Sequence, residues 1–236
     1  MKVLASDFDG TLFFKGTFKP EDLRQIRAFQ EQGHRFGLCT GRPLPGVTEP
    51  IRGVLRCDFM ILSSGALILD DKGRIIYKAC IDHDTAVQVG RMFDSKLDFY
   101  YQTCEGTYCQ RLPDGQIPAS ASILTAIPYR IFTRLSELPS DIYGLSLYAK
   151  TDDYARQIAM KINTQFPSLA AFQNEEWIDV APRGCSKGKG IEILKSHLAL
   201  DTIAGIGDSY NDILHFSYLS IFSIVSFLIS SLNTVR

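Results

Sequence analysis

The first ten residues constrain the fold of this chain more than any other stretch. An apolar run at residues 3–6 leads directly into Asp7, Phe8 and Asp9, and Gly10 follows. This pattern predicts a buried strand that delivers acidic side chains to its carboxyl end, the edge at which open α/β sheets bind ligands. Two carboxylates so close together ionise only where a cation or a shared proton relieves their repulsion. The stretch therefore indicates metal binding, acid/base chemistry, or both.

Two later strand patterns also end in polar residues or glycine. Residues 35–40 predict a strand that ends at Thr40 and Gly41, after a helix predicted over residues 20–33. Residues 202–206 predict another strand, and it is followed by three further polar groups: Asp208, Asn211 and Asp212. The carboxyl ends of parallel strands meet at one edge of a sheet. We therefore expect these groups to converge there with the acids of the N-terminal strand.

The alternation of strands and helices at both ends of the chain predicts an α/β fold with a Rossmann-like parallel-sheet core. From residue 81 to residue 184 helical and extended patterns alternate without an acidic strand end. This middle segment is long enough for a small core of its own. We therefore predict a core domain formed by residues 1–80 and 185–236, with an α+β domain inserted at residues 81–184.

Composition restricts the functions that this chain can have. It has 236 residues, of which 45% are hydrophobic, and a formal net charge of -1, so no electrostatic argument favours a nucleic-acid partner. The six cysteines form no C-x-x-C pair, which favours small buried side chains in a reducing compartment, and a Cys104–Cys109 disulfide has no positive support. No signal peptide precedes the first strand, and we expect a cytoplasmic protein.

The polar groups at the predicted edge suit phosphoryl chemistry. Carboxylate and amide oxygens without His or Cys partners form an oxygen-only set, which favours Mg²⁺. The hydroxyl of Thr40 and the N–H of Gly41 suit phosphate oxygens, and Lys187, which starts a helix predicted over residues 187–197, adds a positive charge. A carboxylate nucleophile beside a second carboxyl that acts as acid and base permits a covalent aspartyl-phosphate route.

Four ordered motifs resemble those of the haloacid dehalogenase superfamily. They are residues 7–11 (DFDGT), 40–42 (TGR), 186–188 (SKG) and 207–212 (GDSYND). The match is closest to the Cof-type phosphatases, which carry an α/β cap between the second and third motifs. The resemblance covers residues 1 to about 212, and it implies a hydrolase that acts on small phosphorylated metabolites, such as sugar phosphates, with Mg²⁺ as cofactor.

The resemblance also implies a role for each motif residue. Asp7 is implied as the nucleophile and a metal ligand. Asp9 is implied as the acid that protonates the leaving group and the base that activates water, and its main-chain carbonyl as a metal ligand. The remaining implied roles are phosphate binding by Phe8, Thr40, Gly41, Lys187 and Asn211, and metal binding by Asp208 and Asp212. Lys189 is a second candidate for the lysine role, ranked below Lys187 because Ser-Lys-Gly fits the motif better.

The C-terminal segment departs from the pattern of similar proteins. Residues 213–235 contain no Asp, Glu, Lys or Arg. Three interpretations stay open: a buried helix and strand that close the core, an altered terminus that leaves the sheet short, or a membrane-associating tail, which its many serines disfavour. We favour the altered terminus.

Two alternative functions accompany the phosphatase prediction: a phosphomutase that uses the same site, and a catalytically impaired binding or regulatory protein. The sequence does not fix the oligomeric state.

Overall fold

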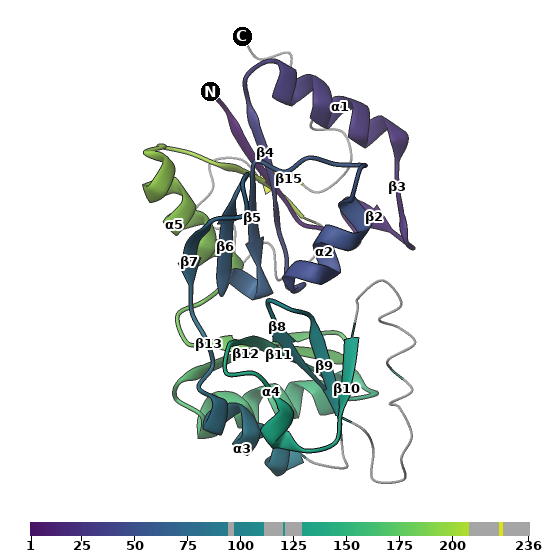
Figure 1. Ribbon diagram of the computed structural model, residues 1–236, viewed down its shortest axis with the longest axis vertical. Coiled ribbons are helices and arrows are strands. Elements are labelled where there is room, and N and C mark those ends of the chain that lie inside the picture. The colour runs from purple at the N-terminus through teal and green to yellow at the C-terminus, as the bar shows by residue number, and fades with distance from the viewer. Residues whose placement is uncertain (94–96, 111–119, 121–128, 208–221, 224–236) are drawn as a thin grey trace. The chain divides into compact units, whose positions relative to one another are not determined.

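The N-terminal apolar run forms β1 (Val3–Ser6), the third strand of a seven-stranded sheet (Figure 1). The computed structural model describes residues 1–93, 97–110, 120, 129–207 and 222–223. The sheet order is β15-β14-β1-β4-β5-β6-β7, and the other strands are β4 (Arg35–Cys39), β5 (Phe59–Leu62), β6 (Leu67–Asp70), β7 (Ile75–Lys78), β14 (Ala204–Ile206) and β15 (Phe222–Ser223). β1 pairs in parallel with β4 and β14, β4 with β5, and β14 with β15, whereas β6 runs antiparallel to β5. The predicted α/β class with a parallel-sheet core is therefore confirmed.

Helices cover both faces of this sheet (Figure 1). The first, α1 (Pro20–Glu31), starts with proline at a favourable first-turn position and buries Ile26 and Phe29. On the other face α5 (Lys187–Leu198) packs Ile191 and Leu194 against apolar side chains of the sheet. The hydroxyl of Ser186 caps α5 by accepting a hydrogen bond from the N–H of Lys189, at 3.0 Å. These two helices agree with their sequence predictions.

The sequence patterns predict a loop over residues 13–19 and a helix over residues 47–55, and the structure differs from both predictions. The helix expected over residues 47–55 is α2 (Leu44–Ile51), because Pro45 suits a first helical turn and Gly53, with φ +70°, follows the helix end. The loop expected over residues 13–19 contains a hairpin, β2 (Phe13–Phe14) and β3 (Thr17–Phe18). Aromatic packing stabilises this hairpin, since the rings of Phe8 and Phe13 stack with centroids 4.9 Å apart.

A second unit contains a six-stranded sheet and comprises residues 42–49 and 78–185. Its sheet order is β10-β9-β8-β11-β13-β12, with strands β8 (Asp98–Thr103), β9 (Thr107–Gln110), β10 (Tyr129–Phe132), β11 (Ile142–Tyr148), β12 (Leu169–Asn174) and β13 (Trp177–Pro182). Two helices, α3 (His83–Phe93) and α4 (Asp152–Gln165), pack on one face of it (Figure 1). The α+β character expected for the insertion is present. The domain limits given above stay a prediction.

The tight contact between α5 and the core sheet depends on glycine. Gly65 has φ +88°, and a Cβ placed on it would lie 2.2 Å from the main-chain oxygen of Ser186, the residue that caps α5.

We expect Gly65→Ala to lower the free energy of unfolding by about 3 kcal/mol or more, since left-handed strain adds to a clash with main-chain atoms. Gly73→Ala is the matched control, because Gly73 has φ +74° but nothing within 4 Å of the added Cβ, and we expect a loss of about 1 kcal/mol. Urea denaturation measures both, and equal losses would contradict the assigned contact.

All six cysteines lie in the described residues, and no disulfide joins any two of them. Cys39, Cys109 and Cys185 are buried as expected, whereas Cys80 and Cys104 are exposed, because each flanks the end of a strand or bridge in the second unit. Burial, together with the carboxylate of Asp58, raises the pKa of Cys57 to about 12.

This pKa predicts slow alkylation of Cys57. At pH 8 the thiolate fraction of such a group is about one part in 10⁴, and the thiolate is the reactive form. We expect iodoacetamide at pH 8 to modify Cys57 far more slowly in the folded protein than in the urea-unfolded protein. Mass spectrometry of peptides from timed samples gives both rates. Equal rates in the two states would show that the folded structure does not protect this thiol.

Candidate active site at the carboxyl end of the core sheet

Asp7 lies directly after β1, at the carboxyl end of the parallel strands. Its N–H donates a 2.8 Å hydrogen bond to the carbonyl of Ile206 at the end of β14, which continues the pairing of the two strands by one residue. The hydroxyl of Ser6 donates to the Asp7 carbonyl at 2.8 Å. Only 8% of the Asp7 side chain is exposed. The local sequence therefore places a nearly buried carboxylate at the sheet edge with its main chain fixed.

A lysine far along the chain contacts this carboxylate. The Nζ of Lys187 lies 2.7 Å from Oδ1 of Asp7, and 12% of the lysine side chain is exposed. A buried ion pair of this kind holds two charges in a fixed position, and removal of one partner leaves the other uncompensated. The rival Lys189 instead binds Glu192 at 2.9 Å with both side chains partly exposed. The structure thus brings Asp7 together with Lys187 and directs Lys189 elsewhere.

The turn after Asp7 positions Asp9. The carbonyl of Phe8 accepts hydrogen bonds from the N–H groups of Leu12 and Phe13 at 3.0 and 2.8 Å, and Gly10 adopts φ +73°. Asp9 is exposed on this turn, whereas the side chain of Phe8 is buried. Because the Phe8 ring packs inside the hairpin, only its main chain is available for the predicted phosphate binding.

Thr40 and Gly41 follow β4, the neighbour of β1. Thr40 is 2% exposed, and its N–H donates to the carbonyl of Ile61 at 2.9 Å. The carbonyl of Thr40 accepts a 3.1 Å hydrogen bond from the N–H of Ser64. The ends of adjacent strands β1 and β4 thus carry Asp7 and Thr40, and the start of α5 supplies Lys187. This convergence is the one expected for the carboxyl edge of a parallel sheet.

Sequence reasoning assigned no role to the residues after β5. Ser63 and Ser64 have φ +45° and +53°, and Gly65 follows with φ +88°. Non-glycine residues in this conformation cost of order 1–3 kcal/mol each and are frequent at functional sites. The strained turn binds the Thr40 carbonyl through Ser64 and contacts Ser186 through Gly65. We infer that this turn positions the two elements that carry Thr40 and Lys187. The sequence signal for such a turn is a Ser-Ser-Gly run directly after an apolar strand.

The predicted metal set is only partly within the described residues. Asp208, Asn211 and Asp212 lie outside them, and so do the predictions for residues 213–236, apart from β15. In the described part of the chain no group of three or more His, Cys, Asp or Glu side chains forms a cluster that could hold a metal ion. Asp7 and the main chain of Asp9 supply hard oxygen atoms at the sheet edge, which is donor chemistry that suits Mg²⁺.

Comparison with known proteins identifies the family. A family model described as haloacid dehalogenase-like hydrolase matches residues 4–223. A Streptococcus pyogenes protein named as a bifunctional phosphatase and peptidyl-prolyl cis-trans isomerase is 25% identical over 230 residues, which cover 94% of this chain but 47% of that protein. The chain thus spans about half the length of that relative. An HMP-PP phosphatase from Serratia proteamaculans is 24% identical, with 89% of this chain and 78% of that protein covered.

Comparison with solved structures shows the same fold. The crystal structure of a haloacid dehalogenase-like hydrolase from B. subtilis superposes with a TM-score of 0.82 at 18% sequence identity, and the match covers 98% of this chain and 93% of that chain. Among the helices within the described ranges, none is long and apolar enough to cross a bilayer. The resemblance found in the four motifs and the predicted class of enzyme, a hydrolase, are confirmed.

Proposed function

The chain belongs to the haloacid dehalogenase-like hydrolases, and from this premise we propose that it is a phosphatase that hydrolyses small phosphorylated metabolites through an aspartyl-phosphate. The observation that carries the proposal is the buried pair of Asp7 and Lys187 beside Thr40. A carboxylate held at a sheet edge next to a fixed cation and a hydroxyl suits attack on a phosphorus atom whose oxygens need neutralisation.

The reaction consists of two displacements at phosphorus. In the first, an oxygen of Asp7 bonds to phosphorus while the ester bond breaks, and the leaving oxygen takes a proton from the carboxyl of Asp9. In the second, Asp9 removes a proton from water, the water oxygen bonds to phosphorus, and the acyl-phosphate bond breaks to restore Asp7 and release phosphate. The exposed position of Asp9, two residues from a buried nucleophile, suits a group that must meet both leaving group and water.

Charge neutralisation accompanies both steps. Lys187 offsets the charge of Asp7 and of the transferring group, and the Thr40 hydroxyl, the main-chain N–H groups of Phe8 and Gly41, and Asn211 bind phosphate oxygens in this proposal. Asp7, the carbonyl of Asp9, Asp208 and Asp212 would hold Mg²⁺. The ion, when bound, reduces the repulsion between the phosphate and the attacking carboxylate.

We propose that the second unit, which we call the cap, selects the substrate class. On the face of the cap sheet opposite α3 and α4, Gln102 donates to the hydroxyl of Ser146 at 2.7 Å, and Ser146 donates to Asp179 at 3.0 Å. The rings of Tyr100 and Trp177, 5.8 Å apart, lie on the same sheet. We propose that this polar chain selects hydroxyl-rich substrates such as sugar phosphates, since hydroxyl groups can replace its hydrogen bonds.

Ser146→Ala tests this selection. Loss of the hydroxyl interrupts the polar chain, so we expect the ratio of kcat/KM for the best sugar phosphate to kcat/KM for p-nitrophenyl phosphate to fall about tenfold. Ser136→Ala is the control, because Ser136 is exposed on the same unit. A ratio that stays the same in both variants would remove this face from the proposal.

Phosphate release from a panel of phosphorylated metabolites tests the proposed function as a whole. The full chain is assayed with Mg²⁺ and again with excess EDTA, and we expect release only with the metal ion. Absence of release from every ester, p-nitrophenyl phosphate included, would contradict the proposal. Steady isomerisation of a hexose phosphate without free phosphate would instead identify a phosphomutase.

A further inference from the structure

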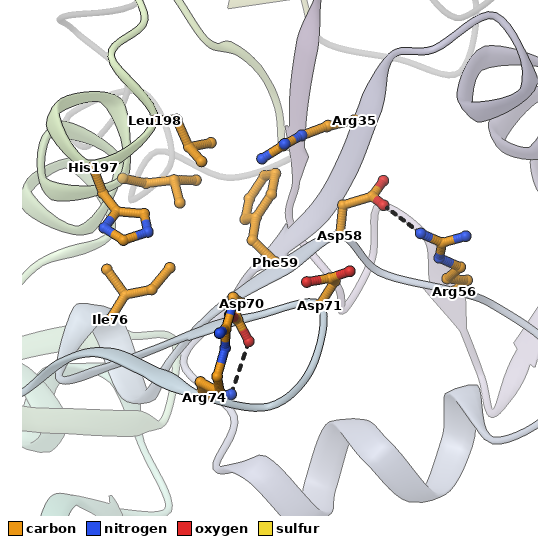
Figure 2. Close-up of a pocket in the computed structure, with 11 residues that line it drawn as sticks. Arg35, Arg56, Asp58, Phe59, Asp70, Asp71, Arg74, Ile76, His197 and Leu198 are labelled. Carbon is orange, nitrogen blue, oxygen red and sulfur yellow. Dashed lines mark hydrogen bonds and ion pairs between the residues drawn. The ribbon is translucent and has the colours of Figure 1, made fainter.

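A cavity lies on the core sheet away from the proposed active site (Figure 2). It measures about 390 Å³ and is lined by the first residue of β4, the residues at the start of β5, the turn between β6 and β7, and the last turn of α5. These are the amino ends of β4 and β5, whereas Asp7 and Thr40 lie at carboxyl ends. The helix α5 begins at Lys187 and reaches the cavity with His197 and Leu198, about 16 Å along its axis. The cavity therefore shares elements with the active site but none of its residues.

Most charges in this cavity are already neutralised within the protein. Arg56 binds Asp58 at 3.3 Å, and Asp58 also accepts hydrogen bonds from the Phe36 N–H and Gln30. Arg74 binds the Asp70 carboxylate at 2.7 Å, and its guanidinium and main-chain N–H hold the pKa of that carboxyl below its usual value even though burial opposes this. These two pairs add no net charge to the cavity.

Three polar side chains lining the cavity remain without partners. Arg35, Asp71 and His197 form no hydrogen bond or ion pair through their side chains with any other described residue. In the view of Figure 2, Phe59 lies between the guanidinium of Arg35 and the carboxylate of Asp71. The cavity thus presents one unpaired positive charge and one unpaired negative charge, with a hydrogen-bonding ring beside them.

The rest of the lining is apolar. Phe59 and Leu194 are buried in the core, and Ile76 and Leu198 are half-buried at the cavity wall. A volume of about 390 Å³ lies within the range of small-molecule sites. A ligand that fits this lining has one anionic group, one cationic group and an apolar body.

We propose that the cavity binds a free α-amino acid with an apolar side chain. Its carboxylate would pair with Arg35, its ammonium group with Asp71, and its side chain would pack on Ile76 and Leu198, the apolar wall residues that are only partly buried. A phosphorylated amine fits less well, because a phosphate monoester carries close to two negative charges at neutral pH and Arg35 is the single unpaired guanidinium among the described residues that line the cavity. The inference does not depend on the proposed phosphatase activity.

Calorimetric titration of the full chain with L-leucine tests the proposal. We expect saturable binding of one leucine per chain. Isocaproate lacks the amine and isoamylamine lacks the carboxylate, and each should bind about tenfold more weakly or less, because one unpaired charge of the cavity then stays unmatched. Absence of saturable leucine binding, or equal binding of either analogue, would overturn the proposal.

Matched variants locate the binding. Arg35→Gln and Asp71→Asn should each weaken leucine binding about tenfold or more. Arg27→Gln on the exposed face of α1 and Lys72→Gln beside Asp71 are the controls and should leave binding unchanged. Thermal unfolding checks that all variants fold, which we expect because Arg35 and Asp71 stabilise no partner. Leucine binding that survives both Arg35→Gln and Asp71→Asn would place the ligand elsewhere and contradict the proposal.

Discussion

Replacement of Asp7 by asparagine is expected to lower kcat for p-nitrophenyl phosphate by about 10³-fold or more, because an amide does not form the acyl-phosphate. Asparagine has nearly the same shape as aspartate, so the buried position after β1 remains filled. Steady-state release of nitrophenol with Mg²⁺ measures the loss, and circular dichroism checks the fold. The variant also leaves the charge of Lys187 without its Asp7 partner, so the fall reports on chemistry where circular dichroism shows a folded protein.

Asp201→Asn is the control for this variant. Asp201 is an exposed carboxylate just before β14 in the same unit. Its replacement by asparagine removes the same charge as Asp7→Asn at a position that does not contact the site. We expect its kcat to match that of the unmodified chain. Equal activity of the Asp7→Asn protein and the unmodified chain would exclude Asp7 as the nucleophile.

Replacement of Lys187 by methionine is expected to affect both stability and turnover. Its ammonium group lies 2.7 Å from the Asp7 carboxylate, and both side chains are nearly buried, so the variant leaves a buried charge uncompensated. Breaking such a pair lowers the free energy of unfolding by about 3–5 kcal/mol. We also expect a fall in kcat of about 10²-fold or more, since a fixed positive charge next to the transferring group is lost. Urea denaturation and the nitrophenol assay measure the two effects.

Lys189→Met and a double variant separate the causes. Lys189 pairs with Glu192 at the surface, so its loss should change stability by about 0–1 kcal/mol. In the double variant Asp7→Asn, Lys187→Met both charges are removed, and much of the lost stability should return because no charge remains unpaired. If Lys189→Met lowers stability as much as Lys187→Met, or if the double variant recovers none of it, the pairing of Asp7 with Lys187 is not what holds this site.

Local patterns predicted much of the core. The apolar run before Asp7 predicts β1, Pro20 and the following acids predict the start of α1, and Ser186 predicts the cap of α5. Each of these signals acts over a few residues, which is why sequence alone reveals it. The convergence of Asp7 and Thr40 also follows, because the carboxyl ends of parallel strands share an edge.

Features that depend on tertiary contacts were not predictable in the same way. The Phe13–Phe18 hairpin forms because Phe8 stacks on Phe13, and neither ring indicates by itself where it packs. The strands β10 and β12 are held by their neighbours β9 and β13 rather than by strong patterns of their own. The left-handed turn at Ser63 and Ser64 is imposed by contacts with Thr40 and Ser186. Lys187 pairs with Asp7 across 180 residues of chain. No local pattern predicts this pairing, and only the family resemblance of the ordered motifs does.

The central claim is that Asp7 becomes phosphorylated and that Asp9 is needed to hydrolyse the intermediate. Asp9→Asn with p-nitrophenyl phosphate tests it most directly, because nitrophenolate leaves without a proton whereas water still needs a base. We predict a burst of about one nitrophenol per chain, then a stall, with a phosphoryl group on the Asp7 peptide in rapidly quenched samples analysed by mass spectrometry. Sustained turnover by this variant with no phosphoryl group on Asp7 would contradict the account.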